Sequence, residues 1–282
     1  MSPLSCSNLL FSYDKKPLLE NISLDFTAGQ FVALIGANGA GKSTLLQLLL
    51  GLIKQQSGTV FIDGRDIHRQ KRRDIAKQLA FVPQSIELPY AFSAQALVAM
   101  GRNPYLGPFE LETAEDQRII HNAMHQTDIT HLKNRLVTTL SGGEKQRVII
   151  ARALAQQAAT LLLDEPIANL DICHQIETLQ LIRALTHSGK LAISALHDLN
   201  LAARYCDRLI LLGQMPGSSA TTVVADGSPA QVLTADNLAQ CFSIAADIIT
   251  CKGIVNLTNI RPIKEKIEQD NYATQSTTSA VY

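Results

Sequence analysis

The chain has 282 residues, of which 46% are hydrophobic and 18% charged, which is enough to bury a sizeable core in one large domain or in a core with a subdomain. Lys and Arg number 25, and so do Asp and Glu; this balance excludes a strongly basic nucleic-acid-binding protein and a wholly disordered acidic chain. The longest apolar run, residues 45–53, is interrupted by Gln47 and Gly51 and is far too short to span a bilayer, so any association with a membrane would require a partner protein.

The first third of the chain predicts short strands with one helix among them. Apolar and polar stretches alternate from residue 8 to residue 35, interrupted by turn signals. A basic stretch at residues 68–77 fits a solvated helix face. The clearest elements are predicted, in order, as a strand at 31–35, a helix at 43–50, and strands at 59–62 and 80–82.

The rest of the chain alternates between helices and strands after a helical stretch. Between residues 86 and 138, glycine and β-branched residues become rare and helix formers dominate, which indicates a helical insert. Strands and helices then alternate, and this is typical of a largely parallel α/β sheet. The predicted elements are helices at 93–100 and 114–125, a helix after residue 143, a strand at 160–163, a helix at 173–186, a strand at 191–195, a helix at 199–205, and a closing hairpin of 209–212 with 221–225.

A phosphate-binding loop is indicated between the strand at 31–35 and the helix that follows it. The sequence there matches G-x-x-x-x-G-K-[ST] in the strand–loop–helix context that a P-loop requires. Glycines let the backbone wrap tightly, so that N–H groups point at phosphate oxygens beside the positive end of the helix. We expect Lys42 to reach the β- and γ-phosphates and Ser43 to bind Mg²⁺. The residues of this loop predicted to bind ATP are Gly36, Ala37, Asn38, Gly39, Ala40, Gly41, Lys42, Ser43 and Thr44.

Two carboxylates, Asp164 and Glu165, end the apolar run at residues 161–163. A buried strand would deliver Asp164 to the Mg²⁺ shell, whereas Glu165 points elsewhere and can polarise an attacking water. An ordinary strand that ends at a solvated acidic turn would have the same pattern. The P-loop upstream favours the catalytic interpretation.

A third motif, Leu-Ser-Gly-Gly-Glu-Lys-Gln-Arg at residues 140–147, begins a predicted helix. Its first turn offers N–H groups and a hydroxyl suited to an anion. A capped helix start with flexible glycines would explain this composition, but not the order of all the motifs. The stretch resembles the signature motif of ATP-binding-cassette (ABC) ATPases, which few other proteins carry beside a P-loop.

The resemblance to ABC ATPases implies further site residues. Tyr13 lies where the family has an aromatic residue that stacks on adenine, although a surface strand tyrosine would look the same. Gln84 matches the Q-loop glutamine, which senses Mg²⁺ and the γ-phosphate, and Asp171 belongs to a D-loop-like stretch. His197 matches the switch histidine that contacts the γ-phosphate. The catalytic set is therefore expected to comprise Glu165, His197, Gln84 and Lys42, and the metal ligands Ser43, Gln84 and Asp164.

The same resemblance implies the fold, which is an α/β P-loop NTPase. It predicts an ABC ATPase domain at residues 3–245, with a RecA-like core, an N-terminal antiparallel β subdomain and an inserted α-helical subdomain at about 86–140. Residues 246–282 are then a C-terminal extension that ends in a flexible polar tail. An extra strand, a contact with a partner subunit and no role at all remain open for this extension.

The resemblance also implies partners, because ABC cassettes pack head to tail in pairs. In such a pair Ser141, Gly142 and Gly143 of one cassette cover ATP on the P-loop of the other, so one P-loop and one signature imply a homodimer. Three stretches, 99–107, 197–207 and 226–233, are similar to ATPase subunits of importers for ferric siderophores, haem and cobalamin. This similarity implies two integral-membrane permease subunits and a separate solute-binding protein, with the cassette peripheral on the cytoplasmic side of the inner membrane.

Two other functions fit the same motifs. One is a soluble ABC-type ATPase that is not coupled to solute transport, and the other is the ATPase subunit of an exporter. The stretch at 99–107 favours import by similarity alone, and a Pro-containing loop between insert helices would look the same. The transported solute is not encoded here, since a permease and a capture protein select it.

Overall fold

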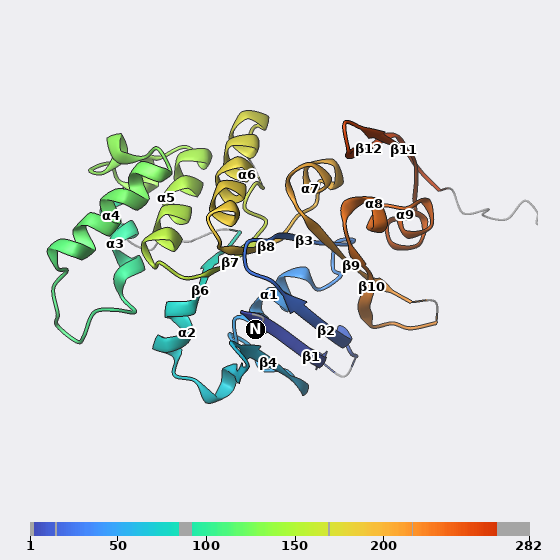
Figure 1. Cartoon of the computed structure of the whole chain (residues 1–282), viewed down its shortest axis with the longest axis horizontal. Coiled ribbons are helices and arrows are strands. Elements are labelled where there is room, and N and C mark those ends of the chain that lie inside the picture. The colour runs from blue at the N-terminus through green and yellow to red at the C-terminus, as the bar shows by residue number, and fades with distance from the viewer. Residues whose placement is uncertain (1–2, 15, 85–91, 169, 216, 264–282) are drawn as a thin grey trace, which may run out of the picture.

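A computed structural model of the chain describes residues 3–263, apart from residues 15, 85–91, 169 and 216. The predicted start of the helical insert at about 86 and the predicted tail from 264 lie outside the described residues. The described part forms a ten-stranded sheet with helices on both faces and a separate two-stranded hairpin (Figure 1). Within this part, no helix has the length and apolar character needed to cross a membrane.

The large sheet has a parallel half and an antiparallel half, in the order β5-β4-β1-β2-β10-β9-β3-β8-β7-β6. From β9 to β6 each strand runs parallel to its neighbour, whereas β5, β4, β1 and β2 pair antiparallel. The predicted RecA-like core and antiparallel N-terminal subdomain are thereby confirmed, and so is the closing hairpin, which is β9 with β10. The strands are β1 (Leu4–Phe11), β2 (Leu19–Phe26), β3 (Phe31–Ile35), β4 (Ser57–Ile62), β5 (Arg65–Asp66), β6 (Leu79–Val82), β7 (Thr160–Asp164), β8 (Leu191–Ala195), β9 (Arg208–Gln214) and β10 (Thr221–Gly227).

The central strand β3 is buried on both faces, which explains its uninterrupted apolar sequence. Phe31, Ala33 and Ile35 belong to one hydrophobic cluster, which includes residues of helix α6 (Ile172–His187). Val32 and Leu34 belong to the other cluster, together with the leucines of helix α1 (Lys42–Leu49). Because side chains alternate between the faces of a strand, β3 joins both cores. The phosphate-binding loop between β3 and α1 is therefore held by the most buried part of the fold.

Three helices gather beyond the β6 edge of the sheet, at the left of Figure 1. They are α3 (Ala94–Ala99), α4 (Ala114–Gln126) and α5 (Gly142–Ala155), which contact one another, and α5 also contacts β6. Helix α5 lies after the predicted end of the insert at about 140, yet it packs with α3 and α4. The insert bounds themselves stay a prediction. The other helices are α2 (Arg72–Gln78), α7 (Leu199–Tyr205), α8 (Pro229–Val232) and α9 (Ala235–Phe242).

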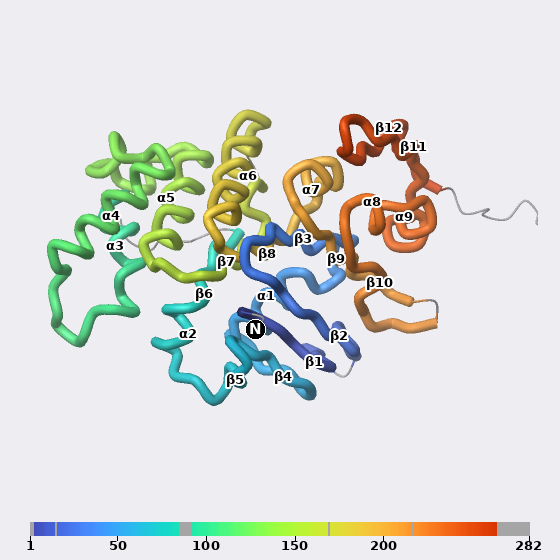
Figure 2. The backbone as a smooth tube through the Cα atoms, in the orientation of Figure 1, coloured from blue at the N-terminus to red at the C-terminus, as the bar shows by residue number. Residues whose placement is uncertain are grey.

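The sequence left open whether the C-terminal extension forms an extra strand. Its described part contains β-structure, with two strands rather than one. Strands β11 (Ile244–Cys251) and β12 (Ile254–Pro262) form an antiparallel hairpin that lies beside α7 (Figure 2). Asn200 of α7 donates to the carbonyl oxygen of Leu257 at 3.1 Å and accepts its N–H at 2.7 Å. Val255 and Leu257 are buried. The hairpin is thus fixed to a helix that begins close to His197.

Candidate functional site

The predicted site residues follow the carboxyl ends of four adjacent parallel strands, β3, β8, β7 and β6. The P-loop follows β3 and His197 follows β8, while Asp164 ends β7 and Gln84 follows β6. Carboxyl ends of parallel strands meet at one edge of a sheet, where α/β proteins bind ligands. Side chains more than 150 positions apart in the chain (Lys42 and His197) are brought into one cavity in this way.

The P-loop backbone has a shape that depends on glycine at two positions. At Gly36, a Cβ atom would lie 2.4 Å from the carbonyl oxygen of Leu212 in β9, so any larger residue would push the loop off the sheet. Gly41 has a φ of 81° and caps α1, and a Cβ there would lie 2.8 Å from Leu19. Both positions therefore favour glycine, so that the loop can turn closely around a ligand and expose the first N–H groups of α1.

The Lys42 ammonium group is buried inside this loop. Its Nζ donates to the carbonyl oxygens of Gly36 at 2.9 Å and Ala37 at 3.1 Å. Burial lowers the pKa of Lys42, and the charges of Glu165 and Asp164 act in the opposite direction. A cation held here by neutral carbonyls is available to anionic oxygens that enter the loop.

Ser43 and Asp164 come together from different elements, as predicted for a pair of Mg²⁺ ligands. The Ser43 hydroxyl donates to Oδ1 of Asp164 at 2.8 Å. Burial raises the pKa of the Asp164 carboxyl, and the hydrogen bond from Ser43 partly offsets this effect. A hydroxyl and a nearly buried carboxylate are hard oxygen donors of the kind that Mg²⁺ prefers.

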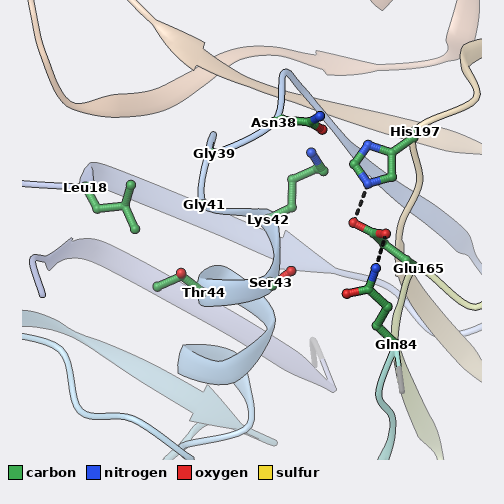
Figure 3. A pocket seen from close by; sticks show the side chains of 10 residues that line it. All are labelled: Leu18, Asn38, Gly39, Gly41, Lys42, Ser43, Thr44, Gln84, Glu165 and His197. Carbon is green, nitrogen blue, oxygen red and sulfur yellow. Dashed lines mark hydrogen bonds and ion pairs between the residues drawn. The ribbon is translucent and has the colours of Figure 1, made fainter. Parts of the chain in front are cut away.

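Glu165 is held by the two residues predicted to act with it. Gln84 donates from Nε2 to Oε2 of Glu165 at 2.7 Å, and Nε2 of His197 contacts the other carboxylate oxygen (Figure 3). Glu165 has a φ of 49°, a left-handed conformation that costs energy in a residue other than glycine. This turn after β7 directs Asp164 and Glu165 to different partners, which fits separate roles for the two carboxylates.

One cavity of about 510 Å³ collects Lys42, Ser43, Gln84, Glu165 and His197, whereas Asp164 lies behind Ser43 and is not among its lining residues. Its lining is polar apart from one leucine, Leu18, which no sequence pattern had marked as a site residue. Tyr13 is not among the lining residues. It is 65% exposed, its ring meets Phe11 edge-on, and its hydroxyl lies 3.3 Å from Oγ1 of Thr44. The lining residues are Leu18, Asn38, Gly39, Gly41, Lys42, Ser43, Thr44, Gln84, Glu165 and His197 (Figure 3).

The signature residues do not line this cavity. Ser141 caps α5 in a capping box: its hydroxyl accepts the Glu144 N–H, and Glu144 accepts the Ser141 N–H at 2.8 Å. Ser141 and Gly142 are exposed at this helix start. Asp171 caps α6 and is also exposed. The signature therefore presents its anion-binding features to solvent rather than to the P-loop of its own protomer.

Comparison with known proteins identifies the family of the chain. Residues 19–168 match the family model described as ABC transporter. The iron(3+)-hydroxamate import ATP-binding protein FhuC of Bacillus subtilis is 38% identical over 89% of this chain and 91% of its own length. The hemin import ATP-binding protein HmuV of Bordetella pertussis is 39% identical over 87% of this chain and 94% of its own length.

A solved structure of a metal-chelate type ABC transporter in an inward-facing conformation contains a similar chain. It aligns with a TM-score of 0.78 and 28% identity, covering 94% of this chain and 99% of the other. The motifs, the fold and these relatives together establish that the chain belongs to the ABC transporter family, as one of its ATPase subunits.

Proposed function

We propose that this chain drives an importer for large metal chelates, namely ferric siderophores, haem or cobalamin. The observation that carries the proposal is the cavity in which the P-loop, Gln84, Glu165 and His197 converge without any signature residue. Such a site binds ATP by itself but lacks the groups that would enclose the γ-phosphate from the other side. Closure by a second cassette would complete the site and supply the movement that a transporter needs.

Each residue has a defined task in ATP hydrolysis on this proposal. Lys42 neutralises charge on the β- and γ-phosphates, together with the N–H groups at the start of α1. Glu165 orients and polarises the attacking water, while Gln84 and His197 hold its carboxylate in place. Tyr13, whose hydroxyl lies 3.3 Å from Oγ1 of Thr44 at the end of the loop, offers its exposed ring to adenine.

The donor set fits Mg²⁺. Ser43 and Asp164 supply a hydroxyl and a carboxylate side by side, and Gln84 lines the same cavity as Ser43. Across the described residues, no three His, Cys, Asp or Glu side chains form a cluster that could hold a metal without a substrate. A bound Mg²⁺ would stabilise negative charge on the phosphates, which contribute ligands of their own.

We infer that the completed site lies between two copies of this chain. Ser141 and Gly142 are exposed, and the D-loop residue Asp171 is followed by Ile172, an isoleucine that is 75% exposed. A large apolar side chain beside exposed polar motif residues is typical of a surface that is buried on association. In the head-to-tail pair, Ser141, Gly142 and Gly143 of each protomer would cover the ATP on the other protomer.

The import direction and the solute class rest on the relatives. FhuC and HmuV are named for the import of iron(3+)-hydroxamate and hemin, and the structural neighbour is of metal-chelate type. The chain would act at the cytoplasmic side of the membrane, attached to two permease subunits that receive solute from a separate binding protein. The stretch at 99–107, which lies at the end of α3, is where we expect a permease to dock.

ATP-driven dimerisation of the Glu165→Gln variant tests the site and its closure together. This variant keeps a polar group of the same shape but loses the charge that polarises water, so we expect ATP and Mg²⁺ to trap it as a closed dimer. Light scattering after gel filtration measures the mass. The matched control, Lys42→Ala in the same background, should remain monomeric. A Glu165→Gln protein that stays monomeric with ATP and still hydrolyses it would contradict the proposal.

A further inference from the structure

His174 lies between the signature and the D-loop, two motifs that the proposed function places at the surface between two copies of the chain. It occupies the first turn of α6, directly after the D-loop. Its Nδ1 lies 2.7 Å from Oδ2 of Asp171, and its backbone N–H donates to Oδ1 of the same carboxylate at 3.0 Å. These two bonds lower the pKa of Asp171, the backbone bond having the larger effect. Asp171 and His174 thus form one locally bonded unit.

The other side of the imidazole ring lies against the signature. A Cβ atom built on Gly143 would lie 3.0 Å from Cγ and Cδ2 of His174 and 3.3 Å from Nε2. Gly143 is an ordinary helical residue without positive φ, so its backbone conformation does not demand glycine. The nearby ring favours glycine instead, because a side chain at this position would force His174 to move by a few tenths of an ångström.

A second contact lies one turn further along both helices. Nη1 of Arg147 in α5 is 3.7 Å from Oε2 of Glu177 in α6. The pairs Gly143–His174 and Arg147–Glu177, which we call the α5–α6 seam, join the two helices that lie side by side in Figures 1 and 2. Glu177 is half exposed and the ion pair is long, so it contributes little. The contact between the His174 ring and Gly143 is therefore the main link between α5 and α6 near the signature.

We propose that His174 is a positioning residue for ATP hydrolysis, which fixes the signature and the D-loop of one protomer as a single preorganised surface for the partner's nucleotide. The proposal rests on the dimer of the proposed function. When the two motifs are already ordered relative to each other, closure does not have to order them, and less binding energy is lost. His174 does not line the cavity of its own P-loop, so nucleotide binding to the separate protomer is independent of it.

Three replacements separate the parts of this contact, each made in the Glu165→Gln background. His174→Ala removes both the ring and the hydrogen bond. His174→Asn keeps a donor near Asp171 without the ring, and His174→Phe keeps the ring without the donor. The control is Cys173→Ala, an exposed neighbour whose thiol donates to Oε1 of Glu177 at 3.7 Å.

We expect His174→Ala to weaken ATP-driven dimerisation at least about tenfold, which corresponds to about 1.4 kcal/mol. The dimerisation affinities of His174→Asn and His174→Phe should fall between those of His174→Ala and the parent. The affinity of Cys173→Ala should equal that of the parent. The affinity for ADP and the melting temperature should be unchanged in all four. Weaker dimerisation with unchanged ADP affinity and melting temperature distinguishes positioning from general destabilisation, which would lower the melting temperature as well.

A double-mutant cycle tests the contact directly. The added methyl of Gly143→Ala meets His174. This change should therefore weaken dimerisation more when His174 is present than in the His174→Ala protein. Equal costs in the two backgrounds would overturn the proposal, and so would unaltered dimerisation of His174→Ala. If the Glu165→Gln parent itself failed to dimerise with ATP, the proposed function would fall and this inference with it.

Discussion

Arg102 provides a buried ion pair whose loss should be measurable. Its side chain is 5% exposed, and its Nε lies 2.8 Å from Oδ1 of Asp116, which is 8% exposed. Its Nη1 donates to the carbonyl oxygen of Ala155 at 2.8 Å and to Gln157 at 3.0 Å. The guanidinium carbon lies 4.0 Å from the centre of the Tyr105 ring. Arg102 therefore ties the end of α3 to α4 and to the carboxyl end of α5.

The magnitude follows from what Arg102→Ala would leave behind. Removing one partner of a buried pair typically costs about 3–5 kcal/mol, because the other charge stays buried. Here Thr113 still donates its hydroxyl at 2.7 Å and its N–H at 2.9 Å to Asp116, so we expect the lower end, about 3 kcal/mol. At about 2 °C for each kcal/mol in a chain of this size, the melting temperature should fall by about 6 °C.

Thermal unfolding followed by circular dichroism at neutral pH measures this loss. The matched control is Arg118→Ala on α4, the helix that carries Asp116; Arg118 pairs with Glu115 at 2.7 Å, but both side chains are about 60% exposed. Solvent-exposed pairs contribute about 0–1 kcal/mol, so the control should melt within about 2 °C of the wild type. Similar melting temperatures for the two variants would refute the reasoning that burial determines the cost.

Other predictions concern nucleotide binding and acid stability. Lys42→Ala should weaken ATP binding at least about tenfold in a fluorescence titration, because a charge-assisted hydrogen bond is worth about 1.5–3 kcal/mol; wild-type affinity would contradict the P-loop role. Tyr13→Ala should also weaken ATP binding, by about 1–3 kcal/mol if the ring stacks on adenine, whereas Tyr13→Phe should bind like the wild type; equal effects of the two changes would exclude stacking. Hydrogen bonds from Thr113 and Arg102 lower the pKa of Asp116 from 3.8 to about 2. Its stabilising contribution is therefore complete above the unfolded pKa and is lost as the pH falls through about 2, so the stability difference between wild type and Asp116→Asn should shrink over that range.

Local sequence patterns predicted the parallel core because the apolar strand sequences and the motifs that follow them agreed there. The apolar residues of β3 and β7 have no polar face, as expected for strands covered by helices on both sides. The P-loop at Gly36–Thr44 and the carboxylates Asp164 and Glu165 each follow such a strand. Gln84 and His197 were assigned to the site through the resemblance to ABC ATPases, and the parallel strands, which place their carboxyl ends together, explain why both meet Glu165.

Contacts between distant segments had no comparable signal. Leu18 reaches the cavity only because β2 begins beside Gly41 of the P-loop. No sequence pattern marked the approach of His174 to Gly143, which depends on how α5 and α6 pack. Arg102 lies in the stretch at 99–107 that resembles importers, but its burial and its pairing with Asp116 follow from the arrangement of three helices. Such packing is determined by tertiary structure rather than by local propensity.

Affinity purification of tagged Glu165→Gln protein from gently solubilised membranes, with ATP present, tests the central claim most directly. Mass spectrometry then identifies what the closed form holds, and tagged Lys42→Ala protein serves as the matched control for ATP-dependent partners. We predict that an integral-membrane permease with several transmembrane segments co-purifies, and that its identity indicates the chelate transported. A protein found only in the soluble fraction, with soluble partners alone, would contradict the importer function and leave an ABC ATPase that acts elsewhere.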